Sequence, residues 1–203
     1  MAEVEINLKD ELVLKPLNVE DAEEIAAVIK SDRSFFAEWI NEDIQGVSIE
    51  SIKEFIMQEI SCCEIKNNFL FTLRYKNSFL GITGFYNTSR SNNKTEIVLW
   101  FSNKIRTVQY YSDVIKELIA VGFNEKNYNR ITVKAPANDF TLSSVLRKFG
   151  FVIEGTERSG YYNVFNKYSD IVFYGLLNKE YRDQIEFFNR AEKLFQRDKS
   201  KKK

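Results

Sequence analysis

The chain contains no histidine, and this absence restricts the chemistry that its side chains can do. Ser-His-Asp and Cys-His catalysis are both excluded, as is every metal site that needs an imidazole ligand. The two cysteines, Cys62 and Cys63, are adjacent in the sequence. Neighbouring cysteines rarely pair and two thiols cannot complete a zinc site, so we expect free thiols, a reducing compartment and no bound metal.

The overall charge balance does not indicate an extended nucleic-acid surface, which normally needs a basic excess. The 203 residues include 29 Lys and Arg and 29 Asp and Glu, and 44% of the chain is hydrophobic, as in ordinary globular proteins. The basic run from Arg197 to Lys203 is interpreted as a solubilising tail. The first residues resemble no signal peptide, and no run approaches the ~20 apolar residues of a membrane span. We therefore expect a cytoplasmic protein with no membrane contact.

The predicted elements alternate as in a mixed α/β sheet. A strand at residues 12–17 is followed by a helix capped by Asn18 and a second helix opened by Ser48. An antiparallel meander covers residues 69–101, with a hairpin turn at Lys76-Asn77-Ser78. The second half alternates strands with helices that are expected around residues 111–119 and from Asp139, and closes with strands at 151–154, 161–165 and 168–177. The order predicts a central sheet of about seven strands flanked by helices on both faces.

No repeat and no Pro/Gly/Ser-rich linker divides the chain. We expect one domain over residues 1–180, followed by a C-terminal helix and basic tail over residues 181–203. Tyr181, Ile185 and Phe188 share one side of that helix. This apolar side must be buried on the domain itself or on a partner, which leaves a homodimer open.

Five stretches in the correct order resemble the GNAT acetyltransferases, and in particular their ribosomal-protein N-terminal acetyltransferase branch. They read LVLKPLNVEDAEEI, DRSFFAEWI, TEIVLWFSNK, NRITVKAPANDFTLSSVLRKFGFVIEGTER and KYSDIVFYGLLNKEY. The resemblance runs from about Leu12 to Tyr181. It implies the GNAT fold, acetyl-CoA as cofactor, and an amine acceptor, which is either a protein N-terminus or a small molecule.

Members of this family hold the cofactor diphosphate on backbone N–H groups at a helix start, in a Q/R-x-x-G-x-G/A motif. Arg106 fits the first position, but Gln109 and Tyr111 stand where small residues are expected. A non-glycine residue at positive φ costs about 1–2 kcal/mol, and we expect the phenol ring to crowd the diphosphate. The cofactor contacts that the resemblance implies are Val98, Leu99, Trp100, Arg106, Thr107, Val108, Gln109, Tyr111, Asn138 and Ser143.

The following helix departs from the family pattern as well. Asp139 and Leu142 stand where the family has an Asn that contacts the pantetheine arm and a Ser that protonates the departing thiolate. Asn138 and Ser143 each lie one residue away. Shifting the match to the motif by one residue restores either the Asn or the Ser, but no single shift restores both.

The resemblance also implies the catalytic and acceptor residues. Glu96 takes the place of the general base, with a strand-end surface carboxylate as the alternative interpretation. Tyr161, or its neighbour Tyr162, is the candidate acid through its phenol. The aromatic residues Phe35, Phe36 and Trp39 are expected to line the acceptor pocket, although aromatics at helical spacing are commonly core residues.

Two functions of different classes follow. The first is an acetyl-CoA-dependent N-acetyltransferase. The second is a degenerate GNAT-fold protein that does not use acetyl-CoA normally and binds a ligand or a protein through the old cleft. The replaced loop residues Gln109 and Tyr111 are the reason for keeping the second hypothesis.

Overall fold

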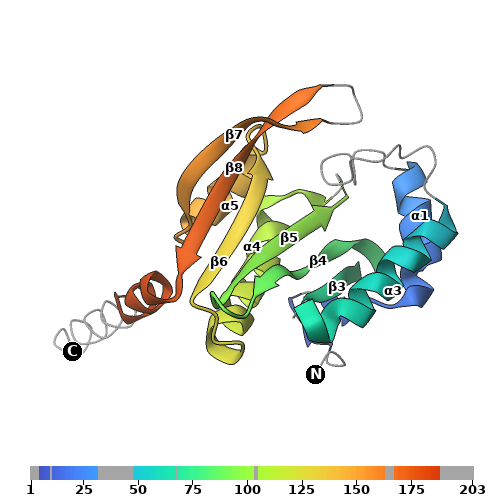
Figure 1. The fold of residues 1–203 in the computed structure, drawn as a ribbon, viewed down its shortest axis with the longest axis horizontal. Coiled ribbons are helices and arrows are strands. Elements are labelled where there is room, and N and C mark those ends of the chain that lie inside the picture. The colour runs from blue at the N-terminus through green and yellow to red at the C-terminus, as the bar shows by residue number, and fades with distance from the viewer. Residues whose placement is uncertain are drawn as a thin grey trace, which may run out of the picture.

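The chain forms one mixed sheet of eight strands in the order β1-β2-β3-β4-β5-β6-β8-β7, with helices on both faces (Figure 1). The computed structural model describes residues 5–9, 11–31, 48–66, 68–102, 105–162 and 167–187. The strands are β1 (Ile6–Asn7), β2 (Leu12–Pro16), β3 (Phe69–Tyr75), β4 (Ser78–Ser89), β5 (Lys94–Phe101), β6 (Arg130–Pro136), β7 (Val152–Tyr162) and β8 (Tyr168–Leu177). The helical segments are η1 (Val19–Asp21), α1 (Ala22–Ser31), α3 (Ile49–Lys66), α4 (Val108–Ala120), η4 (Val121–Glu125), α5 (Phe140–Lys148) and residues 178–187.

The expected mixed α/β architecture is confirmed, with two differences in the strands. The two-residue strand β1 was not predicted, because so short a segment carries no periodic signal. The strands predicted at 151–154 and 161–165 are wrong as separate elements, because β7 runs without a break from Val152 to Tyr162; residues 163–166 lie outside the described part of the chain. Its pairing with β8 continues through two register shifts, so the turn-like residues between Gly155 and Gly160 are accommodated as irregularities within the strand.

The helices α1 and α3 cover one face of the N-terminal half of the sheet. Asn18 and Asp21 form the expected capping box at the start of this helical region. Ile25 and Ile29 of α1 and Ile56 of α3 are buried together in one hydrophobic cluster with side chains of β4 and β5. Local capping and an apolar stripe therefore direct both helices onto the sheet.

The opposite face is covered by α4 and α5, which Figure 1 shows behind the sheet. All five residues predicted for the buried side of α4 are buried, and they belong to the larger hydrophobic cluster of the protein. Asp139 caps α5 as expected by accepting a hydrogen bond from the N–H of Leu142 at 2.9 Å. Gly150 follows the helix at φ 87°, a conformation that favours glycine.

Part of the last predicted helix is described. Residues 178–187 are helical, and the ring of Tyr181 lies 5.2 Å from that of Phe123. Some of its apolar side therefore packs on the domain itself, while a homodimer stays a prediction. Phe188 and Phe195 lie outside the described residues, as does the aromatic segment 35–40. No helix in the described ranges is long and apolar enough to cross a membrane.

A partly buried ion-pair cluster joins η1 and α1 to the β3–β4 hairpin. The guanidinium of Arg74 contacts Asp21 at 2.7 Å and Glu24 at 2.9 Å, and the side chains of Arg74 and Asp21 are only 13% and 14% exposed. Glu24 also accepts a hydrogen bond from the backbone N–H of Phe79 at 2.9 Å. The cluster joins residues that are more than fifty positions apart in the sequence.

We expect Arg74→Met to lower the free energy of unfolding by roughly 2–4 kcal/mol, because it leaves partly buried carboxylates without their cation. The control Lys76→Met removes the pair with Glu11, in which the side chains are 60% and 66% exposed, and should change stability by less than about 1 kcal/mol. Urea unfolding measures both values. Equal effects of the two variants would show that the Arg74 cluster is not a structural anchor.

Candidate active site

The sheet opens between β5 and β6. These two strands are parallel and pair over only three residues each, Lys94 to Glu96 with Arg130 to Thr132. Beyond Glu96, β5 continues to Phe101 paired with β4, whereas β6 continues paired with β8. The described C-terminal part of β5 is therefore unpaired on its β6 side, and such free backbone groups can bind a ligand as an added strand would.

The three predicted contacts on β5 lie along this opening. Val98 and Trp100 face the α1/α3 layer, and Leu99 faces the α4/α5 layer, so the alternation of a strand places them on both faces. The carbonyl of Val98 already accepts a hydrogen bond from the Thr83 hydroxyl at 2.7 Å. All three side chains are buried, so any contact to a ligand here must come mainly from the backbone.

The N-terminus of α4 is accessible and suits an anion. Thr107 is the N-cap residue, and its side chain accepts from the N–H of Tyr110. Val108 and Gln109 are exposed, and the first turn carries no acidic residue. The free N–H groups and the positive end of the helix dipole favour a phosphate at such a position. The residues present thus fit the diphosphate of a CoA-type cofactor.

The expected strain and crowding at this helix start are wrong. Gln109 is helical and is not among the described residues with positive φ, so no glycine is needed there. Tyr111 is 1% exposed and points into the core, where its ring stacks on Phe101 at 5.3 Å. Its hydroxyl donates to Asp139 at 3.0 Å, so the phenol bridges α4 to α5 and leaves the exposed first turn clear.

The other predicted cofactor contacts, Arg106, Asn138 and Ser143, lie in three different surroundings. Arg106 donates from Nε to the carbonyl of Phe101 at 3.1 Å, which ties the loop to the end of β5. Asn138 is exposed beside the start of α5. The hydroxyl of Ser143 accepts from Tyr174 of β8 at 2.8 Å, one strand beyond β6. Ser143 thus turns toward β8, and the buried Leu142 takes the place facing the core.

Glu96 lies at the point where β5 and β6 separate. Its side chain is 11% exposed and contacts Nζ of Lys134 at 3.1 Å, while Nδ2 of Asn87 donates to it at 3.4 Å. These residues line a cavity of about 340 Å³ together with Thr132 and Phe173. The alternative interpretation as a surface carboxylate is wrong, because Glu96 is buried and faces a cavity.

Tyr161 is not brought to this cavity. It pairs with Ser169 near the far end of the β7–β8 hairpin, whereas the cavity contacts β8 at Phe173. Four residues of strand span about 13 Å. The structure therefore separates the two predicted catalytic residues. Phe35, Phe36 and Trp39, predicted for the acceptor pocket, lie outside the described residues.

The residues that surround Glu96 were not predicted from the sequence. Lys134 follows Thr132 in the regular alternation of β6, between the buried Val133 and Ala135, so the strand pattern carried no signal that marked it out. Tyr86 is the cross-strand partner of Glu96. Burial, with the nearby charges of Glu59 and Glu96, raises the pKa of the Tyr86 phenol, so this group stays protonated throughout the physiological range. Within the described residues, no cluster of His, Cys, Asp or Glu is arranged to hold a metal ion.

The candidate site consists of a split parallel strand pair, an exposed helix N-terminus and a buried carboxylate where the strands separate. The sequence profile of the acetyltransferase (GNAT) domain matches residues 11–152, so the chain belongs to the GNAT acetyltransferase family. It is a transferase for which the family reaction is acetyl transfer to an amine. The sequence resemblance to this family is thereby confirmed.

Individual relatives agree with the family assignment. YdaF of Bacillus subtilis (strain 168), which carries a ribosomal N-acetyltransferase name, is 24% identical over 178 residues, 87% of this chain and 97% of that protein. The ribosomal-protein-S5-alanine acetyltransferase from Vibrio fischeri has a TM-score of 0.75 at 18% identity, covering 88% of this chain and 98% of its own. RimL, a ribosomal L7/L12 α-N-protein acetyltransferase solved with coenzyme A, has a TM-score of 0.76 at 14% identity, covering 86% and 98%.

We expect Gln109→Gly to leave CoA affinity within about threefold, because residue 109 is already helical and its N–H is already in place. The same change should lower the free energy of unfolding by up to about 1 kcal/mol, the usual difference between glycine and other residues in helices. Isothermal titration with CoA and urea unfolding give the two values. A gain in affinity of tenfold or more would mean that the wild-type helix start does not suit the diphosphate.

Proposed function

We propose that the protein is an acetyl-CoA-dependent N-acetyltransferase whose acceptor is the N-terminal amine of a protein. The observation that carries the proposal is the position of Glu96. It is a buried carboxylate at the vertex of the β5–β6 opening, with a cavity in front of it. A base at this vertex lies where an acceptor and a cofactor arm, entering from opposite faces of the sheet, would meet.

The cofactor would be held by backbone groups more than by side chains. The first turn of α4, from Thr107 to Gln109, supplies N–H groups for the diphosphate. The unpaired side of β5 at Val98 to Trp100 supplies groups for the pantetheine amides. When bound, acetyl-CoA supplies the acetyl group as an activated thioester.

Glu96 would accept a proton from the acceptor amine. An α-amino group has a pKa near ~8 and is mostly protonated at pH 7, so a modest base is sufficient to neutralise it. Lys134 and Asn87 both contact Oε2 of the carboxylate, which restricts its orientation at the cavity that all three residues line. Tyr161 has no assigned step in this proposal, because it pairs with Ser169 and is not among the residues that line the cavity at Glu96.

The names of the relatives support a protein N-terminus as the acceptor. The Vibrio fischeri enzyme is a ribosomal-protein-S5-alanine acetyltransferase, and RimL acts on ribosomal L7/L12. The cavity at Glu96 is open to the sheet surface and has room for the first residues of an extended chain. A ribosomal protein is therefore the first acceptor to test.

Saturating acetyl-CoA should raise the midpoint of thermal unfolding by several degrees. Ligand at 100 times its dissociation constant adds about 2.7 kcal/mol to the stability of the folded state. The scan is made at fixed protein concentration, with adenosine as a control ligand that lacks the diphosphate and the pantetheine arm. The absence of a shift at millimolar acetyl-CoA would overturn the proposed cofactor.

Replacement Glu96→Gln should reduce kcat for a peptide amine at pH 7 by about 100-fold, within the usual range for loss of a general base. The difference should narrow above about pH 9, where the acceptor amine is already neutral. CoA release from acetyl-CoA in the presence of an N-terminal ribosomal peptide measures the rate. The control Glu125→Gln changes an exposed carboxylate and should leave the rate unchanged. An unaltered rate for Glu96→Gln would remove this residue from the mechanism.

A further inference from the structure

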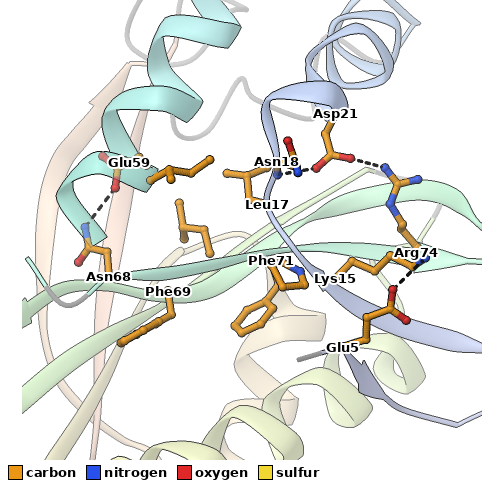
Figure 2. A pocket seen from close by; sticks show the side chains of 13 residues that line it. Glu5, Lys15, Leu17, Asn18, Asp21, Glu59, Asn68, Phe69, Phe71 and Arg74 are labelled. Atoms are coloured by element: carbon orange, nitrogen blue, oxygen red, sulfur yellow. Dashed lines mark hydrogen bonds and ion pairs between the residues drawn. The ribbon is translucent and has the colours of Figure 1, made fainter. Parts of the chain in front are cut away.

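A second and larger cavity, of about 590 Å³, lies outside the candidate active site. It is found where the chain leaves β2 and crosses the start of β3, beside the second half of α3 (Figure 2). Leu17, Ile60 and Leu70 give it an apolar wall, and Ile60 is 47% exposed at its rim. None of the residues that line it also line the cavity at Glu96.

Most of the charges in this cavity are paired with each other. Nζ of Lys15 lies 3.2 Å from Glu5, and the guanidinium of Arg74 lies 2.7 Å from Asp21, as the dashed lines in Figure 2 show. Both cations that line the cavity are therefore neutralised by their own carboxylates. The remaining ionisable group of the lining is Glu59.

Glu59 is a buried acid whose described partner is a neutral amide. The residue is 9% exposed, and its carboxylate accepts a hydrogen bond from Nδ2 of Asn68 at 3.1 Å. Asn68 is itself 4% exposed, and its oxygen accepts the backbone N–H of Thr88 at 3.4 Å, so the amide is held in place. Among the side chains that the structure describes, which do not include those of residues 62–67, no lysine or arginine forms an ion pair with Glu59. A carboxylate removed from water without a cation is costly, and a ligand cation would offset that cost.

We infer that this cavity binds a small organic ammonium ion with an apolar arm, with Glu59 as its counter-ion. An ammonium group carries three donors and can reach the carboxylate oxygen that Asn68 leaves free. The apolar arm lies against Leu17, Ile60 and Leu70. This site is separate from the acceptor cavity, and the inference does not depend on the proposed acetyl transfer.

The cavity is also electrostatically coupled to the candidate active site. After burial, the charge of Glu59 is the next cause of the raised pKa of Tyr86, and Tyr86 lies directly across from Glu96 on the neighbouring strand. An ammonium ion on Glu59 compensates that charge. Occupation of the cavity should therefore lower the pKa of the Tyr86 phenol.

The test uses n-hexylamine as the probe and n-hexanol as the matched ligand without charge, on the full chain without acetyl-CoA. Backbone amide shifts at Leu17 and Leu70 should saturate with hexylamine and respond far less to hexanol. Glu59→Gln keeps an acceptor for Asn68 and removes the charge, so hexylamine affinity should fall by about tenfold or more. The control Glu54→Gln removes an exposed carboxylate of the same helix that does not line the cavity, and affinity should stay within about twofold.

A second variant guards against a Glu59→Gln protein that fails to fold. Ile60→Lys changes an exposed rim residue and supplies an internal cation, so hexylamine binding should be lost while the amide spectrum stays folded. In the wild type, ¹³C-labelled tyrosine spectra should show the Tyr86 pKa falling on binding. Equal binding of hexanol, unchanged affinity in Glu59→Gln, or shifts confined to residues around Glu96 and Lys134 would each overturn the inference.

Discussion

The short parallel pairing of β5 with β6 is the constraint on which the site depends. Over Lys94 to Glu96 the sheet is continuous, and beyond Glu96 the two strands turn to different neighbours. The same separation leaves β5 with a free side and positions the carboxylate at the vertex. The two faces of the sheet differ in what they present. The N-terminus of α4 lies on the α4/α5 face, whereas the side chain of Glu96 lies on the α1/α3 face.

The start of α4 departs from the family motif at Tyr111, and the core accommodates this side chain. Tyr111 stands where the family has a small residue, but its side chain points into the core, away from the exposed first turn of α4. It stacks on Phe101 and bonds to Asp139, so it joins the two helices that flank the opening. The family motif leaves backbone N–H groups accessible at a helix start. The first turn of α4, which begins after the N-cap residue Thr107, also has exposed residues and can offer such groups.

Two buried carboxylates on the α1/α3 side of the sheet have different surroundings. Glu96 has a cation, Lys134, and an amide, Asn87, as partners. Glu59 has an amide alone among the described residues. After burial, the charges of both carboxylates raise the pKa of the Tyr86 phenol, so this group responds to the charge in either cavity.

The sequence by itself determined the elements and their order. Capping at Asn18 and Asp139, the turn at Lys76 and the apolar stripe of α4 are local patterns, and each was confirmed. Glu96 was selected as the candidate base through its position in the family resemblance, and its role stays a prediction. Only the tertiary structure decided the direction of the Tyr111 side chain, the distance of Tyr161 from Glu96, and the pairing of Glu96 with Lys134. Those contacts join residues that are distant in sequence, and their geometry depends on how strands and helices pack, which no local pattern encodes.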